Sequence, residues 1–192
     1  MTFDGKTYGL SAFNSTGADY AEYFEWADKN PNAEDRIGRF VTITNGNQIA
    51  LANIGDEILG VVSGHAAVLG DAYEDSWNGM YDRDIYGRLQ YEEVEVEYEE
   101  EDEEGNLVTR TAIETHIKLN PNYDPTQTYI PRSERPEWAP VGLLGKLVVI
   151  DDGSCVPGGK CSCGINGTAT ASATGYHVLK RLDDTHIQIL LK

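Results

Sequence analysis

The apolar residues of this chain come in short runs, and most of these runs are bounded by Gly, Asn or Asp. Such runs are typical of β-strands, because amphipathic helices need longer segments with a period of about 3.6 residues. The clearest runs are RFVTIT (39–44), QIALAN (48–53), EILGVVSG (57–64), GLLGKLVVI (142–150) and HIQILLK (186–192). NGN at 45–47 separates the first two and predicts a hairpin. The pattern predicts a mainly β fold: a single compact domain with hairpins, long ordered loops and few or no long helices.

The overall composition excludes several classes of protein. The chain has 192 residues, of which 40% are hydrophobic and 24% are charged, as is typical of a folded globular domain. Its formal net charge of −17 would repel nucleic-acid phosphates, so we expect no nucleic-acid partner. No apolar run approaches the roughly 20 residues of a membrane-spanning helix, and the N-terminus lacks the pattern of a signal peptide. We therefore expect no membrane partner.

Much of the negative charge lies in one segment, because ten of the 13 residues from 92 to 104 are acidic. Within it, VEVEY (94–98) alternates apolar residues with glutamates, and TAIETHIKL (111–119) follows with its isoleucines on one face. With DEEGN (102–106) at the tip, these stretches predict a long hairpin that projects from the body of the domain. Its acidic side chains are most simply a solvated face that prevents aggregation through the strand edge. A role in binding a metal or a partner is the alternative.

Two stretches have the composition of loops. The segment from 120 to 140 holds five of the seven prolines, and the segment from 151 to 175 is rich in Gly, Ser, Thr and Ala. The second segment carries all three cysteines, Cys155, Cys161 and Cys163. Because structural zinc needs four ligands, usually in two separated pairs, this spacing favours free loop thiols over a zinc site. We therefore assign no metal.

The stretch FNSTGADYAEYFEW (13–26) combines small hydroxyl residues with carboxylates and aromatic rings. The segment from 18 to 28 contains good helix formers with aromatic residues at helical spacing. The same letters also alternate as a strand would, with Tyr20, Phe24 and Trp26 on one face. We interpret the segment as a strand or a short extended segment.

Part of this stretch could act chemically on its own backbone. The hydroxyl of Ser15 can attack the carbonyl that precedes it and give an ester that water then cleaves, provided that a base takes its proton. Asp19, Glu22 and Glu25 are candidate bases if their aromatic neighbours exclude water and raise their pKa. Gly17 would allow a tight turn that brings Ser15 to Asp19. The residues alone favour a simpler interpretation, in which this is an ordinary turn and Asp19 is a helix N-cap or a surface charge.

Four longer stretches carry a resemblance to a known family. They are STGADYAEYFEWADKNPNAEDRIGRFVTI, ILGVVSGHAAVLGDAYEDSWNGMY, RPEWAPVGLLGKLVV and GYHVLKRLDDTHIQILLK. Together they resemble the Peptidase G2 domain, the autoproteolytic intramolecular-chaperone module at the C-terminus of phage tail-spike and pre-neck appendage proteins. The resemblance covers about residues 13–192, which would make residues 1–12 a leader or a remnant of an upstream spike.

The resemblance implies a chain that forms a homotrimer after a β-helical tail-spike region, helps its copies to assemble, and then cuts itself free. In the family a serine and an aspartate four residues later are associated with this cut, and they correspond to Ser15 and Asp19 here. Ser15 would supply the hydroxyl, and Asp19 would manage its proton. Asn14–Ser15 is the preferred scissile bond, and Ser15–Thr16 is the alternative.

The resemblance also bears on supporting residues, cofactors and location. Glu22 and Glu25 would act as supporting acids or as partners across a trimer interface. The reaction itself requires no cofactor; ATP is linked to the family, but no phosphate-binding motif places a nucleotide site in this sequence. We expect assembly in the cytoplasm of a bacterial host and a parent protein in the virion tail. The alternative function is a non-cleaving module for trimerisation or for receptor or carbohydrate binding, to which the 11 tyrosines and three tryptophans would contribute.

Overall fold

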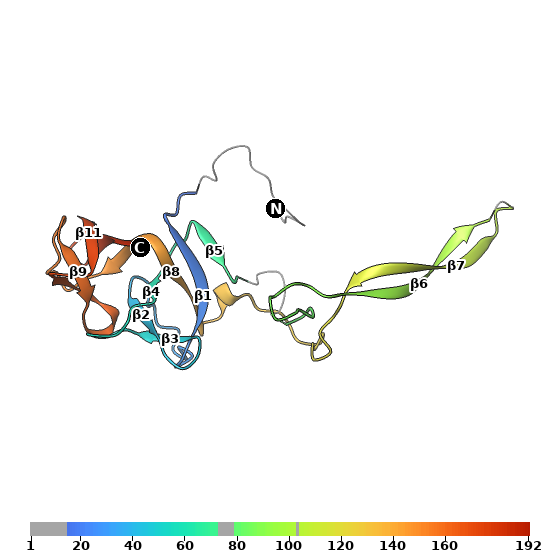
Figure 1. Ribbon diagram of the computed structural model, residues 1–192, viewed down its shortest axis with the longest axis horizontal. Helices are drawn as coiled ribbons and strands as arrows, with labels where there is room; N and C mark the ends of the chain where they lie inside the picture. The colour runs from blue at the N-terminus through green and yellow to red at the C-terminus, as the bar shows by residue number, and fades with distance from the viewer. Residues whose placement is uncertain (1–14, 73–78, 103) are drawn as a thin grey trace. The chain divides into compact units, whose positions relative to one another are not determined.

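The computed structural model describes residues 15–72, 79–102 and 104–192 (Figure 1). The regular structure of these residues consists of β-strands and two short 3-10 helices, so the prediction of a mainly β fold is confirmed. No helix in the described ranges is long and apolar enough to cross a membrane. Asn14, on one side of the preferred scissile bond, lies outside the described residues.

The chain divides into two compact units. The first unit contains residues 1–72 and 132–192, and the second contains residues 73–131. The strands of the first unit are β1 (Asp19–Trp26), β2 (Phe40–Ile43), β3 (Gln48–Leu51), β4 (Gly60–Val62), β5 (Val68–Gly70), β8 (Trp138–Ile150), β9 (Lys160–Cys163), β10 (Ala169–Ser172), β11 (Tyr176–Arg181) and β12 (His186–Leu191). Its 3-10 helices are η1 (Arg132–Glu134) and η2 (Ile165–Gly167). β2 and β3 pair as antiparallel neighbours, which confirms the hairpin predicted around NGN.

β8 is the central strand of the first unit. The strands of this unit form one ten-stranded sheet in the order β10-β9-β11-β12-β8-β4-β2-β3-β1-β5, and β1 also pairs with β8. The pairings from β8 through β4, β2, β3 and β1 therefore return to β8 and close a ring. Residues 138–145 of β8 pair with β1, and residues 145–150 pair with β12. One half of β8 thus belongs to the closed ring and the other half to the open part of the sheet.

Apolar side chains pack in two clusters within this unit. The strands of the ring contribute the first cluster, which contains Trp26, Val41, Ile49, Val62, Ala139 and Val141. The second cluster contains Phe40, Ala52, Val61, Leu147, Val149, Cys155, Cys161, Cys163, Ala169, Val178, Ile187, Ile189 and Leu191. Along β12 every second residue is buried, as the alternating sequence of that strand predicts.

β1 resolves the ambiguous segment around residues 18–28 in favour of a strand. It pairs with β8 over its length, and Ala21, Tyr23 and Trp26 are buried while Tyr20 is exposed. The strand interpretation is therefore confirmed. Trp26, which the alternation predicts on the face of Tyr20, is buried at the end of the strand. Pairing with β8 and burial of these side chains stabilise a conformation that local propensity leaves open.

The predicted loops are wrong where they carry strands. β9 and β10 lie within the segment from 151 to 175 and pair with each other, and β8 already begins at Trp138. Cys161 and Cys163 lie on the same side of β9 and are buried with Cys155 in the second cluster. The three thiols are free and buried; Cys161 and Cys163 lie in β9, whereas Cys155 lies in a loop, so the prediction of loop thiols is wrong for the first two. Burial raises the pKa of Cys161 to about 12, so this thiol stays protonated.

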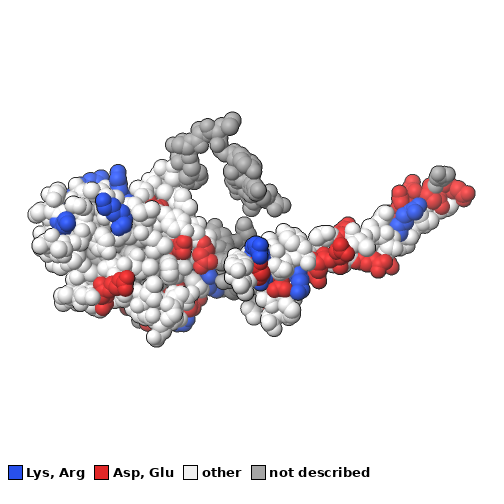
Figure 2. Space-filling view, in the orientation of Figure 1, with Lys and Arg blue, Asp and Glu red and all other residues white. Residues whose placement is uncertain are grey.

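The second unit contains the predicted long hairpin, formed by β6 (Tyr91–Glu101) and β7 (Leu107–Ile117). Figure 2 shows acidic side chains along it. Ile113 lies opposite Glu95, and Ile117 lies opposite Tyr91. Because directly opposite residues share a face of the hairpin, both isoleucines lie on the face that carries the glutamate row and not on the valine face.

Candidate functional site

Asp19 is the first residue of β1, and its side chain is buried. The residue is 5% exposed and faces Gly142 of β8, the strand that pairs with β1. A β-carbon on Gly142 would lie 2.9 Å from Asp19 Oδ2, so this glycine leaves the space that the carboxyl occupies. Oδ2 is buried without a hydrogen-bond partner in the described part of the chain. The interpretation of Asp19 as a surface charge or a helix N-cap is therefore wrong.

Burial raises the pKa of Asp19, because the ionised carboxyl loses hydration. A hydrogen bond with Ser63 and the charge of His65 act in the opposite direction, but the pKa remains above its ordinary value of 3.8. A carboxyl with a raised pKa keeps its proton to a higher pH than usual. It can therefore give and take a proton in a range where an ordinary aspartate is only a base.

Backbone contacts fix the segment that leads into Asp19. The N–H of Ala67 donates a hydrogen bond to the carbonyl oxygen of Asp19 (2.8 Å), and the N–H of Lys146 donates one to that of Ala18 (3.1 Å). Gly17 packs against the backbone of Ala67, because a β-carbon on Gly17 would lie 2.4 Å from Ala67 N. The residues from Gly17 to Asp19 are thus held on one side by Ala67 and on the other by Lys146.

A cavity of about 400 Å³ lies beside Asp19. The polar side chains in its lining are Thr16, Asp19, Ser63, His65, Lys146, His186 and Gln188. Thr16 Oγ1 and His65 Nε2 lie 2.8 Å apart and form a hydrogen bond. Sequence reasoning missed Ser63 and His65 as members of the site. Their only signal is a glycine-rich turn after a strand, with no spacing that relates His65 to a partner 49 residues away.

Ser15 is exposed and lies four residues before Asp19. Its Oγ accepts a hydrogen bond from the N–H of Gly17 (3.2 Å). The carboxyl of Asp19 faces Gly142 and interacts with Ser63, and no hydrogen bond joins the side chains of Ser15 and Asp19, both of which are described. Because Asn14 lies outside the described residues, cleavage at Asn14–Ser15 stays a prediction.

The two other predicted carboxylates lie away from Asp19. Glu22 accepts a hydrogen bond from the hydroxyl of Tyr20, and side-chain alternation places it on the opposite face of β1 from Asp19. Glu25 forms an ion pair with Lys29 (2.6 Å), which lowers the pKa of Glu25. At about 3.3 Å per residue, Glu25 lies about 20 Å along the strand from Asp19. The structure therefore brings neither glutamate to the cavity beside Asp19.

A second cavity, of about 450 Å³, is lined by cationic and aromatic side chains. The guanidinium of Arg36 lies 4.6 Å from the ring centroid of Trp26, and that of Arg132 lies 3.8 Å from that of Trp138. Carboxylates engage both groups: Arg36 has two within 2.9 Å, and Arg132 lies 2.5 Å from Asp71. These arginines already stabilise the fold around the cavity.

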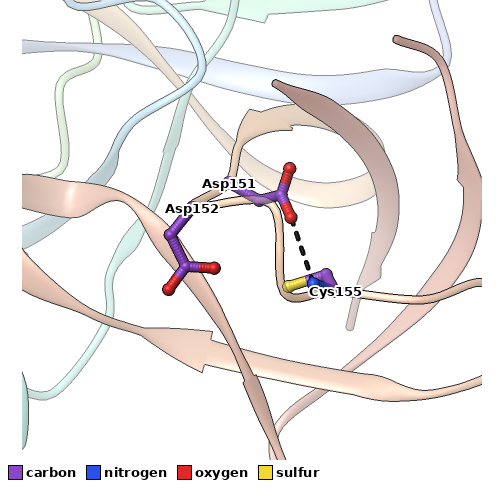
Figure 3. Close-up of side chains that lie close together, drawn as sticks. All are labelled: Asp151, Asp152 and Cys155. Atoms are coloured by element: carbon purple, nitrogen blue, oxygen red, sulfur yellow. Dashed lines mark hydrogen bonds between the residues drawn. The ribbon is translucent and has the colours of Figure 1, made fainter. Parts of the chain in front are cut away.

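Asp151, Asp152 and Cys155 form a cluster of potential metal ligands whose atoms lie within 4.8 Å of one another (Figure 3). Asp151 accepts a hydrogen bond from the N–H of Cys155 (3.2 Å), whereas Figure 3 shows no hydrogen bond between Asp152 and Cys155. Arg181 Nη2 lies 2.8 Å from Asp151 Oδ2. Burial acts to raise the pKa of Asp151, but Arg181 and the Cys155 N–H hold it below its ordinary value. Burial also raises the pKa of the Cys155 thiol to about 11, so the thiol stays protonated. The cluster is a hydrogen-bonded turn around the ion pair of Asp151 and Arg181.

Comparison with known proteins shows a close match to one family. The family model described as Peptidase_G2, IMC autoproteolytic cleavage domain, matches residues 1–186. The pre-neck appendage protein of Bacillus phage B103 is 35% identical over 161 residues, which are 84% of this chain and 17% of that protein. The putative phage-related protein YobO of Bacillus subtilis (strain 168) is 33% identical over 172 residues, which are 88% of this chain and 19% of that protein. The chain thus spans less than one fifth of the length of these relatives.

Two solved structures are similar to this fold. The crystal structure of the pre-mature bacteriophage phi29 gene product 12 has a TM-score of 0.73 at 28% identity, and the match covers 97% of this chain and 23% of that one. The C-terminal fragment of the same phage protein has a TM-score of 0.65 at 29% identity. The second match covers 91% of this chain and all of the fragment. The fold described above is therefore similar to that of the C-terminal fragment of phi29 gene product 12.

Proposed function

Because the chain belongs to the Peptidase G2 family of IMC autoproteolytic cleavage domains, we propose that it cuts its own backbone at Asn14–Ser15 by means of Ser15 and Asp19. One observation carries the choice of residues. A serine is followed four residues later by a buried aspartate with a raised pKa, and one oxygen of that aspartate has no hydrogen-bond partner among the described residues. A buried polar atom without a partner costs free energy, which makes a purely structural role for this carboxyl a poor explanation.

The proposed reaction has two steps, each balanced in protons. Ser15 Oγ first attacks the carbonyl carbon of Asn14; the Oγ–H proton leaves, the C–N bond breaks, and the nitrogen of Ser15 takes up a proton. Asn14 is then joined to Ser15 as an ester. Water next adds to the ester carbon, its oxygen remains on Asn14 as a carboxyl group, and a proton returns to Ser15 Oγ. The products are a carboxyl group on Asn14 and a free amino group on Ser15.

Asp19 would carry the proton in both steps. As a carboxylate it accepts the proton of Ser15 Oγ, and as an acid it delivers that proton to the leaving nitrogen. In the second step it takes a proton from water and returns one to Oγ. A raised pKa suits this shuttle, because the two protonation states then lie closer in free energy at the pH of the reaction.

We also propose that the chain promotes assembly of a homotrimer during phage assembly in the bacterial host, downstream of a β-helical region of its parent appendage protein. The support is an exposed apolar row beside the site. Val68 of β5, Tyr20 of β1 and Leu144 of β8 lie opposite one another and are 48%, 37% and 55% exposed. A neighbouring copy packed on this row would contact β1 and β8, the two strands that hold Asp19 on their other face, which would couple assembly to the cut.

ATP, which the family resemblance implies, finds no matching site in the described residues. The second cavity is the candidate place because it contains arginines and tryptophans. Its arginines are engaged by carboxylates, and Glu34, Asp35 and Glu134 also line it. These negative charges would oppose a triphosphate. The proposed mechanism therefore routes no step through ATP.

The test is a fusion of the full chain to an N-terminal partner protein. Wild type should release a fragment whose new N-terminus is Ser15, as determined by intact mass, whereas Ser15→Ala and Asp19→Asn should stay uncut. Glu25→Gln, which changes another carboxylate of β1, serves as the matched control and should cut like wild type. Release of the same fragment by Ser15→Ala would overturn the mechanism. A wild-type fusion that forms trimers by light scattering but never cuts would identify the alternative, a non-cleaving assembly module.

A further inference from the structure

We infer that His65 is a positioning residue for the cut: it holds the backbone after Ser15 through Thr16, and it lines the same cavity as Asp19. The inference rests on the proposed function of Ser15 and Asp19. It adds to that proposal a residue from the connection between β4 and β5, far away in the sequence.

The contact with Thr16 gives His65 a direct hold on the reacting segment. Thr16 Oγ1 and His65 Nε2 are 2.8 Å apart, and Thr16 is the residue that follows Ser15. Gly17, which follows Thr16, donates its N–H to Ser15 Oγ and packs against the backbone of Ala67. Ser15 is thus oriented by Thr16, which the side chain of His65 holds, and by Gly17, which the backbone of Ala67 holds.

His65 is itself held in place by the fold. Two residues before it, Ser63 donates its N–H to the carbonyl oxygen of Pro140 (2.8 Å). Two residues after it, Ala67 donates its N–H to the carbonyl oxygen of Asp19 (2.8 Å). The same short connection therefore carries the hydrogen bond to Thr16, the side-chain partner of the Asp19 carboxyl and the backbone partner of Asp19. Through these three contacts, the connection between β4 and β5 fixes the position of the segment from Thr16 to Asp19.

The charge of His65 acts on Asp19 in a defined direction. The titratable groups that line the cavity are Asp19, His65, Lys146 and His186. His186 Nδ1 has its own partner in Asp183 (2.9 Å). A positive charge on His65 would lower the pKa of Asp19 and so favour its ionised form. A cationic side chain at position 65 therefore supports the base form of Asp19.

The experiment measures the rate of fragment release from the full fusion protein at one fixed pH. Relative to wild type, His65→Ala and Thr16→Val should each slow release by about tenfold or more, since a misplacement of about 1 Å can cost about 100-fold. His65→Gln can still form a hydrogen bond with Thr16. It should recover most of the rate lost in His65→Ala. His186→Gln, the matched change in the same cavity, should keep the wild-type rate.

Several outcomes would decide against His65 and leave the cut itself intact. These are release at the wild-type rate by His65→Ala and Thr16→Val, or a loss of rate in His186→Gln as large as that in His65→Ala. If His65→Ala releases the fragment slowly and His65→Gln does not restore the rate, then His65 acts only through packing. By contrast, a wild-type fusion that stays whole, or a Ser15→Ala fusion that is cut, would remove the proposed function and this inference together. Thermal unfolding of each variant identifies any that fails to fold, and Thr16→Val tests the same contact from its other side.

Discussion

The carboxyl of Asp19 occupies space that exists only because residue 142 of the neighbouring strand is glycine. A β-carbon there would lie 2.9 Å from Asp19 Oδ2 and 2.4 Å from Leu147 Cδ2. The backbone of Gly142 is meanwhile fixed by pairing with Ala21 of β1 and Val61 of β4. A substitution at this position therefore cannot be absorbed by a movement of β8 alone, and the carboxyl must shift.

Gly142→Ala should displace the carboxyl of Asp19 without removing any functional group. We expect the free energy of unfolding to fall by about 1–3 kcal/mol, as for other overpacked cores, and fragment release to slow by about tenfold or more. Urea denaturation and fusion release measure the two effects. Gly159→Ala is the control: a β-carbon there would meet Val156 at 3.1 Å, and Gly159 does not line the cavity. Release by Gly142→Ala at the wild-type rate would contradict the proposed role of Asp19.

Asp19→Asn should change how stability depends on pH. The folded state raises the pKa of Asp19, so the stability that this group contributes is present at low pH and is lost as the pH rises through the folded pKa. The asparagine variant lacks this loss and should be more stable than wild type at about pH 7. Thermal unfolding of both proteins from about pH 4 to about pH 7 measures the difference. Glu25→Gln should show the opposite sign, because the folded state lowers the pKa of Glu25; parallel curves for Asp19→Asn and wild type would count against a buried, titrating Asp19.

Arg181→Met should destabilise the first unit strongly. The side chain of Asp151 is fully buried, and removal of Arg181 would leave its charge without a cation. Loss of the cation leaves a buried carboxylate uncompensated, so it should cost clearly more than loss of one partner of an exposed pair. Lys29→Gln breaks the more exposed pair with Glu25 and should cost only about 0.2–1 kcal/mol in the same urea denaturation experiment. Similar losses in the two variants would show that burial of Asp151 does not govern the effect.

The same ion pair predicts the behaviour of the protein in acid. Because the folded state lowers the pKa of Asp151, its contribution to stability is present above the ordinary value of 3.8 and is lost as the pH falls through the folded pKa. Wild type should therefore lose stability in acid, and Asp151→Asn should lose less over the same range. Thermal unfolding below about pH 4 measures this, and equal losses in the two proteins would be the contrary result.

The glutamate row on β6 should destabilise its own hairpin. Glu95, Glu97 and Glu99 lie on one face about 7 Å apart, opposite Ile113 and threonines and not opposite cations. A two-stranded hairpin is only marginally stable in water, so this repulsion should be measurable. Changing these three glutamates to glutamine should slow amide hydrogen exchange in β6 and β7 several-fold, and about 0.5 M salt should do the same for wild type. Thr111→Ser is the uncharged control, and unchanged exchange in the triple variant would show that the charges do not weaken the pairing.

The sequence predicts the strands that carry large apolar side chains. β12 is an example, because Ile187, Ile189 and Leu191 alternate with less buried residues and fill the second cluster. β9 and β10 escape prediction for the opposite reason. Their inward residues are Cys161, Cys163 and similarly small side chains, whose hydrophobic signal is too weak to separate a strand from a loop. Only the pairing of β9 with β11 and β10 shows what these residues do.

The candidate site could be predicted only in part. Ser15 and Asp19 follow from a family resemblance, and the residues alone favour a surface role for Asp19. Its burial depends on Gly142, and its polar neighbours Ser63 and His65 come from a separate connection. These relationships arise from the closing of the strands into a ring, which no local pattern reports. Glu22 and Glu25 illustrate the converse, because closeness in sequence places neither beside Asp19 in a strand.

Gly145 pairs with Asp19 on one side and with Leu191 of β12 on the other. The ribosome makes β12 long after it has made β1, so β8 gains its second neighbour only late in synthesis. Until then, Gly145 and the adjacent Lys146, whose N–H holds Ala18, lie in a strand that is paired along only part of its length. Under the proposed mechanism, a nascent chain that has not reached β12 cannot present a finished cutting site. Cleavage at Asn14–Ser15 would thereby wait until translation has passed β12.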